Sequence, residues 1–112
     1  MKRPWAFICA SDGATSKHLR NYCREVYLLG YLPVCPKLQD SQYLVLEDAV
    51  ERSEYTAIVR DKLLRCPMLV VCSRNQDATT NAQIGLAQKY NRIVPTLDGL
   101  KKAVSEGDDL VS

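Results

Sequence analysis

The side chains that could bind a ligand or take part in a reaction are concentrated in four polar segments of the 112-residue chain, at residues 11–15, 37–42, 73–80 and 95–98. They supply hydroxyl, carboxylate, amide and cationic groups for contacts with a polar small molecule. The alternative for each of them is an ordinary role as a solvated loop residue or helix cap. The candidates are Ser11, Asp12, Lys37, Asp40, Ser73, Arg74, Asn75, Asp77, Thr79, Thr80 and Asn81.

Several common enzyme signatures are missing. The five glycines form neither the G-x-G-x-x-G pattern of dinucleotide-binding loops nor the G-x-x-x-x-G-K-[ST] pattern of P-loops. No G-x-S-x-G nucleophile elbow occurs, and the only histidine, His18, is predicted on the polar face of a helix. NAD-dependent redox chemistry, nucleoside triphosphate hydrolysis and serine-hydrolase chemistry are therefore disfavoured.

The five cysteines indicate a reducing compartment, because their number is odd and no C-x-x-C pair occurs. A single histidine does not complete a zinc-site pattern, so we expect no metal and no cofactor. Cys9, Cys35 and Cys72 fall at the ends of predicted strands, which could bring at least two thiols near one crevice. The alternative is that they are buried as small apolar side chains.

Composition and charge predict one domain with its own core. Hydrophobic residues make up 46% of the chain, and the net charge of +2 is scattered rather than gathered into a nucleic-acid-binding surface. Lys17, Arg20 and Arg24 do form a basic group on one predicted helix, either for an acidic partner or phosphate or as a solvated face. No secretion leader and no run near the ~20 apolar residues of a membrane span are found, so we expect a cytoplasmic protein without membrane association.

Alternating strand and helix patterns predict an α/β fold. Continuous apolar runs predict four strands, at residues 5–10, 32–36, 68–72 and 93–95. Apolar positions spaced by three or four residues predict four helices: residues 16–29, residues 46–66, a helix that begins at a cap within residues 79–81 and ends at residue 90, and residues 98–104. We expect a flavodoxin-like or Rossmann-like parallel sheet of about four strands, in the order 2-1-3-4, flanked by helices. Residues 1–105 would form this single domain and residues 106–112 a flexible tail.

The predicted helix ends and the predicted site follow from this order. Expected N-caps are Thr15 or Ser16, then Thr79, Thr80 or Asn81, then Asp98, and the expected stops are Gly30 and Asn91. Parallel sheets bind ligands outside the carboxyl ends of their strands, where the strand order reverses. The four polar segments follow the four strands, so we expect their side chains to line one crevice.

Several segments resemble the small nucleoside 2-deoxyribosyltransferase-like proteins, which include short phage and gut-bacterial domains. The resemblance covers residues 6–100 and rests on FIC at 7–9, Cys23, GYLPVCPKL at 30–38, CPMLVV at 66–71, AQIGLA at 82–87 and IVP at 93–95. It implies a flavodoxin-like sheet, a crevice for a nucleoside or nucleotide, and a bacterial or phage-infected host cytosol.

The resemblance also implies where catalysis would take place. In active members of the superfamily a glutamate at the start of the third helix attacks the anomeric carbon of a deoxyribose. That position is Gln83 here, and an amide is a poor nucleophile. The aspartate expected before the third strand is replaced by Pro67, and the serine-glycine pair of the third loop is absent. Asp12 and Asp77 remain as carboxylates in the appropriate loops, and either one could serve.

The sequence therefore favours a catalytically degenerate member of this group that binds a nucleotide-like ligand or a protein partner. The expected ligand-binding residues are Ser11, Asp12, Lys37, Asp77, Asn81 and Gln83, and the only catalytic candidates are Asp12, Asp77 and Gln83.

Two alternatives stay open. The first is an active nucleoside or nucleotide N-glycosidase or deoxyribosyltransferase, in which Asp12 or Asp77 stabilises a ribosyl cation and Lys37 or Arg74 holds a phosphate. The second is a small accessory or inhibitor protein of a mobile element that acts through protein contacts. A homodimer is compatible with either, and the residues that could supply its contacts are Tyr22, Tyr27, Leu28, Tyr43 and Tyr55.

Overall fold

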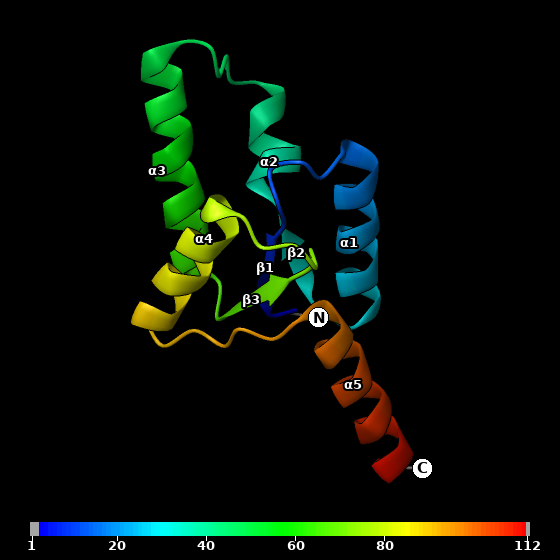
Figure 1. Ribbon diagram of the computed structural model, residues 1–112. Helices are drawn as coiled ribbons and strands as arrows, with labels where there is room; N and C mark the ends of the chain where they lie inside the picture. Colours follow the sequence, from blue (N-terminus) through cyan, green and yellow to red (C-terminus); the bar gives the residue numbers. More distant parts are fainter. Residues whose placement is uncertain (1–2, 112) are drawn as a thin grey trace.

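A parallel sheet of three short strands forms the centre of the protein, in the order β2-β1-β3 (Figure 1). The computed structural model describes residues 3–111. The strands are β1 (Trp5–Cys9), β2 (Leu32–Val34) and β3 (Met68–Val71). Every residue of β3 is buried, as expected for a strand covered on both faces. Pro33 lies in the middle of β2 and is tolerated there because β2 is an edge strand.

The fourth strand predicted at residues 93–95 is wrong as a strand, although its position is occupied. Ile93 and Thr96 form only isolated bridges to β3. The backbone N–H groups of β3 donate to the carbonyls of Ile93 and Pro95, so the segment runs parallel to the strand. Within such a ladder the next donor would be the N–H of residue 95, and proline has none. The sheet therefore has three strands instead of four.

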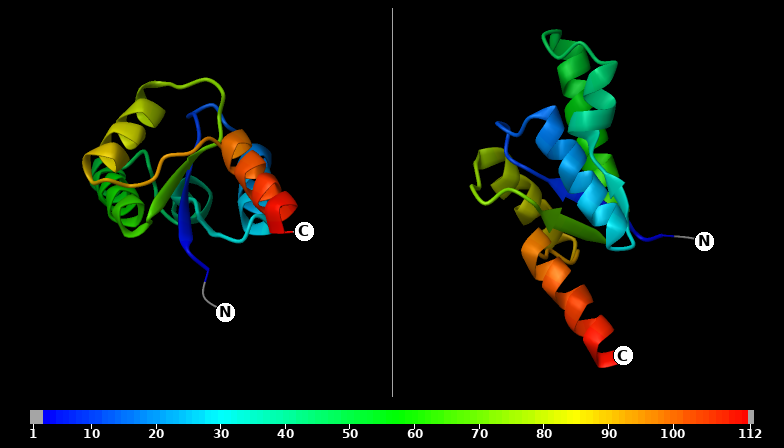
Figure 2. Two further views of the ribbon diagram at one scale, coloured as in Figure 1. Left: turned by 90° about the horizontal axis from the view of Figure 1, so that it is seen from below. Right: turned by 90° about the vertical axis from the view of Figure 1, so that its right-hand side faces the viewer.

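Helices cover both faces of the sheet. Seen from below in Figure 2, α1 (Ser16–Leu28) and α5 (Leu97–Val111) lie on one side, and α3 (Ala49–Arg65) and α4 (Ala78–Lys89) lie on the other. Leu19, Val26 and Leu100 pack with one face of the sheet, while Leu63 and Ala87 pack with the other. The α/β class and the flanking helices are thus confirmed.

Helix α1 begins and ends where the sequence predicts. The Thr15 side chain accepts a hydrogen bond from the backbone N–H of His18, which satisfies one of the free donors at the helix start. Gly30 follows the helix with φ of +103°, a left-handed conformation that glycine adopts without strain.

The connection predicted as a polar loop at residues 37–42 is instead helical. Pro36 begins the short helix α2 (Pro36–Gln39), because its missing N–H is not needed in a first turn. The 3-10 turn η1 (Asp40–Gln42) follows directly. Helix α3 then starts at Ala49, later than the predicted residue 46, because the Asp48 side chain accepts from the backbone N–H of Glu51.

The last two helices have N-caps different from those predicted. Asp77 caps α4 in place of Thr79, Thr80 or Asn81, and Thr96 replaces Asp98 by accepting from the N–H of Gly99. Asn91 ends the α4 region with φ of 59°, as predicted.

Helix α5 runs to Val111, past the predicted end at 104 and through residues 106–111 that were expected to form a tail; Ser112 lies outside the described residues. Its C-terminal end projects away from the sheet (Figure 1). Within residues 3–111, every helix is too short or too polar to cross a bilayer.

Candidate functional site

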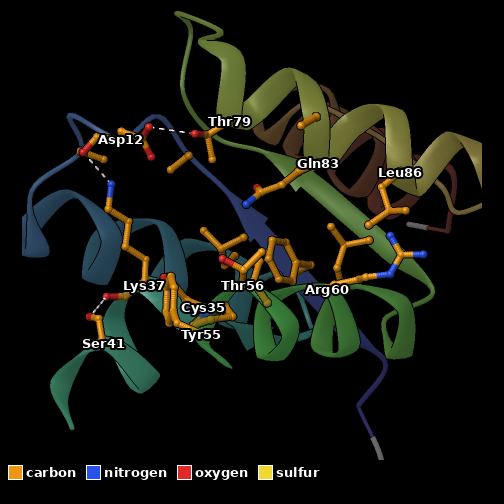
Figure 3. A pocket seen from close by; sticks show the side chains of 18 of the residues that line it. Asp12, Cys35, Lys37, Ser41, Tyr55, Thr56, Arg60, Thr79, Gln83 and Leu86 are labelled. Atoms are coloured by element: carbon orange, nitrogen blue, oxygen red, sulfur yellow. Dashed lines mark hydrogen bonds between the residues drawn. The ribbon is translucent and has the colours of Figure 1, made fainter. Parts of the chain in front are cut away.

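A cleft of about 1110 Å³ opens at the carboxyl end of β1, between α2 and α3 on one side and α4 on the other (Figure 3). We call it the main cleft. Its floor and walls are largely apolar and include Phe7, Ile8, Val59, Leu63 and Leu86. Its polar and charged lining residues are Asp12, Ser16, Lys37, Ser41, Tyr55, Thr56, Arg60, Thr79, Gln83 and Lys89. An apolar hollow with a few converging polar groups is the usual form of a small-molecule site.

Lys37 and Asp12 connect the mouth of the main cleft across three segments. The Nζ of Lys37 in α2 donates to the carbonyl oxygens of Ser11 at 3.1 Å and Asp12 at 2.6 Å, which fixes the loop after β1. The Asp12 carboxylate in turn accepts from the Thr79 hydroxyl of α4 at 2.8 Å. Because an ammonium group has three donors, Lys37 retains one for a ligand at the mouth.

Gln83 reaches from α4 into the main cleft (Figure 3). It is partly buried, and no hydrogen bond joins its amide to another of the described residues. An amide offers both donors and an acceptor, so it is suited to the hydrogen-bonding edge of a nucleobase or to sugar hydroxyls. It is not suited to covalent attack on an anomeric carbon.

The wall contributed by α3 carries an aromatic and a cationic group. Burial raises the pKa of Tyr55 to about 12, and nearby negative groups add to this, so its hydroxyl stays protonated at neutral pH. Arg60 follows Tyr55 five residues later in α3, and its guanidinium donates to the Tyr90 hydroxyl at 3.4 Å. Tyr55, Val59 and Leu63 recur every four residues, which places them on one helix face towards the cleft.

Asp77, a catalytic candidate from the sequence, has a structural role. One carboxylate oxygen accepts from the Thr80 N–H at 2.9 Å, and the other accepts from the Asp12 N–H at 2.8 Å. These two backbone hydrogen bonds hold the pKa of the carboxyl below its ordinary value. Asp77 therefore joins the start of α4 to the loop after β1 and is not among the residues that line the main cleft.

Asp40 is also structural. It is 4% exposed, and its carboxylate accepts from Lys62 Nζ at 2.6 Å and from the Tyr43 hydroxyl at 2.5 Å. Burial alone would raise the pKa of Asp40. The hydrogen bonds from Lys62 and Tyr43 and the positive charge of Lys62 together outweigh burial, so the pKa of Asp40 is below its usual value. The Asp40–Lys62 ion pair joins η1, which follows α2, to α3. It therefore fixes the positions of α2 and α3, two walls of the main cleft, relative to each other.

The remaining candidates lie elsewhere. Asn81 is exposed on α4 and does not line the main cleft, and Thr80 is fully buried. A second cleft of about 630 Å³ lies beside the N-terminal parts of α1 and α5. Its lining includes Ser11, His18, Cys72, Ser73, Arg74, Asn75 and Asp98. Lys37 and Arg74, the two alternative phosphate-binding residues, therefore lie at different clefts, and the single crevice predicted from the sequence is divided in two.

The thiols are also divided between the two faces of the sheet. Cys23 and Cys72 pack against the buried cluster that contains Cys35, whereas Cys9 belongs to the cluster on the α3 and α4 side. The strand-end cysteines are thus largely packed as apolar groups, and all five are free thiols. Among the described residues, no group of three His, Cys, Asp or Glu side chains is arranged to hold a metal ion.

The structure brings part of the predicted set of residues together at one cleft. Asp12, Lys37 and Gln83 come together at the main cleft, while Asp77 and Asn81 do not line it. Tyr55 and Arg60 were missed, although the spacing of Tyr55 with Val59 and Leu63 was a usable signal for a shared helix face.

Compared with known families and curated proteins, the sequence matches no family model and no curated protein.

Proposed function

We propose that the main cleft binds a nucleotide-like ligand and leaves its glycosidic bond intact. The observation that carries this proposal is the Gln83 amide, which lies in the cleft with no hydrogen bond to the described chain. The resemblance stated above places a catalytic glutamate at this position. With glutamine there, the cleft keeps the ability to hydrogen-bond a base or sugar but lacks the nucleophile.

The other cleft residues support the same ligand chemistry. The apolar walls and the Tyr55 ring can contact the flat face of a base, and the free donor of Lys37 can meet a phosphate at the mouth. Asp12 is the only carboxylate among the residues lining the main cleft, and its Oδ2 already accepts from Thr79. A group held in this way is poorly placed to replace a glutamate in the middle of the cleft.

Binding is tested by thermal unfolding of the reduced protein with deoxynucleosides and deoxynucleotides, followed by chromatography of the ligand. A ligand at ~100 times its Kd raises the free energy of unfolding by about 2.7 kcal/mol. We expect a higher Tm and an intact ligand. Gln83→Leu should abolish the shift, while Asn81→Leu is the matched control because Asn81 lies on the same helix outside the cleft. Equal shifts in both variants would refute the proposed site.

A second variant tests why the wild type should be inactive. Gln83→Glu restores a carboxylate at the cleft position, so we expect it to release free base from a deoxynucleoside while the wild type does not. Base release by the wild type that is lost in Asp12→Ala would instead support the glycosidase alternative. Absence of any thermal shift with the wild type would refute ligand binding and leave a protein partner as the better explanation.

A further inference from the structure

The main cleft has cationic side chains at two separate places. Lys37 lies at its mouth, where it donates to the loop after β1. Arg60 of α3 and Lys89 of α4 also line the cleft, and Figure 3 shows Arg60 at the end that lies away from Asp12 and Lys37. Among the described residues that line the cleft, Asp12 is the only carboxylate against these three cations. The lining therefore favours a ligand with more than one negative group.

Arg60 and Lys89 share one aromatic ring, that of Tyr90. The Arg60 Cζ lies 6.0 Å from the ring centroid and the Lys89 Nζ lies 5.9 Å from it, and the Arg60 guanidinium donates to the Tyr90 hydroxyl at 3.4 Å. In the part of the chain that the structure describes, neither cation forms an ion pair with a carboxylate. Two like charges on one ring without an acidic partner repel each other, so a bound anion would be stabilised by both. We call Arg60 and Lys89 the far cations.

The far cations and the mouth are about 15 Å apart along α4. The residues of α4 that border the cleft include Thr79, Gln83, Leu86 and Lys89, which share one helix face at spacings of four, three and three residues. Thr79 bonds the loop after β1 at the mouth. Lys89 follows ten residues later, and at about 1.5 Å per residue the rise is about 15 Å. A single phosphate therefore cannot contact both Lys37 and the far cations.

A ligand of two nucleotide units matches this length. Bonds of about 1.5 Å join successive phosphorus atoms in a nucleic acid, and the whole link spans no more than about 8 Å. Two links reach about 15 Å, whereas a single nucleotide with phosphates on both sides of its sugar reaches about half of that. The cleft volume of about 1110 Å³ also exceeds the ~300–1,000 Å³ of an ordinary small-molecule pocket. Length, charge and volume thus agree on a ligand larger than one nucleotide.

We propose that the main cleft selects a dinucleotide with phosphates at both ends over a single nucleotide. One terminal phosphate meets Lys37 at the mouth, and the other meets Arg60 and Lys89. The first base lies beside Gln83 and Tyr55, and the second unit lies along the apolar walls that separate the two places. This inference rests on the proposed function, because it assigns the size and charge of the ligand to the same cleft.

The test measures affinity by titration calorimetry on the reduced full chain with three probes, each made with thymine and with adenine. They are a nucleoside 5′-phosphate, a nucleoside 3′,5′-bisphosphate and a dinucleotide with phosphates at both ends. The dinucleotide should bind at least about tenfold more tightly than either shorter probe, because only the dinucleotide reaches both Lys37 and the far cations. The bisphosphate controls for charge, since it has two phosphates but the length of one unit. A dinucleotide that binds no more tightly than either shorter probe would overturn this inference, even where binding of the nucleoside phosphate supports the proposed function.

Matched variants assign the effect to the far cations. Arg60→Gln should weaken dinucleotide binding about tenfold and lower the slope of log K against log salt by about 0.7, with nucleoside phosphate binding unchanged. Arg65→Gln is the control, because Arg65 is an exposed arginine of the same helix outside the cleft. Gln83→Leu should abolish binding of every probe, which reports on the proposed function. Equal weakening of all probes by Arg60→Gln, no weakening at all, or the same weakening by Arg65→Gln would overturn this inference, and a lack of binding by every probe would overturn both proposals.

Discussion

Removal of either partner of the Asp40–Lys62 ion pair should destabilise the protein, and the two losses should be unequal. The Asp40 side chain is 6% exposed, whereas the Lys62 side chain is 32% exposed. When Asp40→Asn removes the acidic partner, the ammonium of Lys62 can turn to water. When Lys62→Met removes the basic partner, the Asp40 carboxylate stays buried, and of its two hydrogen-bond donors the Tyr43 hydroxyl is left. Leaving an unpaired buried charge is the more costly change.

The expected magnitudes follow from this difference. Asp40→Asn removes a charge-assisted hydrogen bond and should lower the free energy of unfolding by about 2 kcal/mol. Lys62→Met should lower it by about 3 kcal/mol, the lower end for a broken buried pair because Lys62 is partly hydrated. An unfolding entropy of about 2.1 cal/mol/K per residue gives about 0.24 kcal/mol/K for 112 residues, so these losses lower Tm by about 8 and 12 °C.

The pH dependence has a definite sign. Because the pKa of Asp40 is lowered in the folded protein, its contribution to stability is complete above the unfolded pKa of about 3.9 and is lost as the pH falls through the folded pKa. In Lys62→Met the burial remains without its counter-charge, so the folded pKa should rise above the ordinary value. The deficit of this variant against the wild type should therefore shrink between pH 7 and pH 4 as Asp40 takes up a proton.

Urea unfolding followed by circular dichroism measures these effects, with the double variant Asp40→Asn/Lys62→Met closing the cycle. The double variant should lose less than the sum of the single losses, because the two residues interact directly. Equal losses in the two single variants, additive losses in the double variant, or a Lys62→Met deficit that grows towards pH 4 would each refute this reasoning.

Three further predictions concern other parts of the fold. Leu63→Ala should lower the free energy of unfolding by about 3 kcal/mol in urea titrations, because Leu63 is fully buried beside the main cleft; a loss below about 1 kcal/mol would contradict its core role. Asn91→Ala should lower the free energy of unfolding by about 1 kcal/mol, because alanine has a Cβ atom that is strained at the positive φ of this position and no polar side chain to hydrogen-bond the nearby backbone. Asn91→Gly should not lower it, because glycine adopts a positive φ without strain; equal losses in urea titrations of the two variants would argue against this cause. Pro95→Val should supply the missing donor beside β3, so its amide should be protected in hydrogen exchange, and a fast-exchanging amide at residue 95 would show that the ladder is not completed.

The elements most readily predicted are those with a strong local pattern. The run from Met68 to Cys72 contains no polar residue, and only a strand covered on both faces fits it. The ends of α1 could be predicted because their signals are local: the Thr15 side chain accepts from the backbone three residues on, and Gly30 itself adopts the left-handed conformation that follows the helix. Ile93 and Val94 have the apolar pattern of a strand, but a continued ladder with β3 needs a backbone N–H at position 95, where the residue is proline. The apolar pattern does not reveal this need, because it depends on which strand the segment pairs with.

The site was harder to predict because its contacts join distant parts of the chain. Asp40 and Lys62 are 22 residues apart, and nothing local shows that a loop aspartate will be buried. Asp77 does lie directly before a helix, so its capping role had a local signal, but the two threonines after it offered the same chemistry. Helix α3 carries polar residues on several sides, so the spacing that groups Tyr55 with Val59 and Leu63 did not show which face of α3 borders the main cleft, and Arg60 had no such signal.

The proline in the middle of β2 has a consequence for how copies of this protein can meet. The N–H of Leu32 donates to the Pro4 carbonyl, so alternate N–H groups of β2 point towards β1 and the position of Pro33 faces away from the sheet. At this outer edge proline leaves no donor for an incoming strand. An additional β-strand, whether from a second copy or from an unfolded chain, cannot complete a regular ladder there. The protein is therefore protected against edge-to-edge aggregation along β2, and self-association at this edge must proceed through side chains instead of an extended sheet.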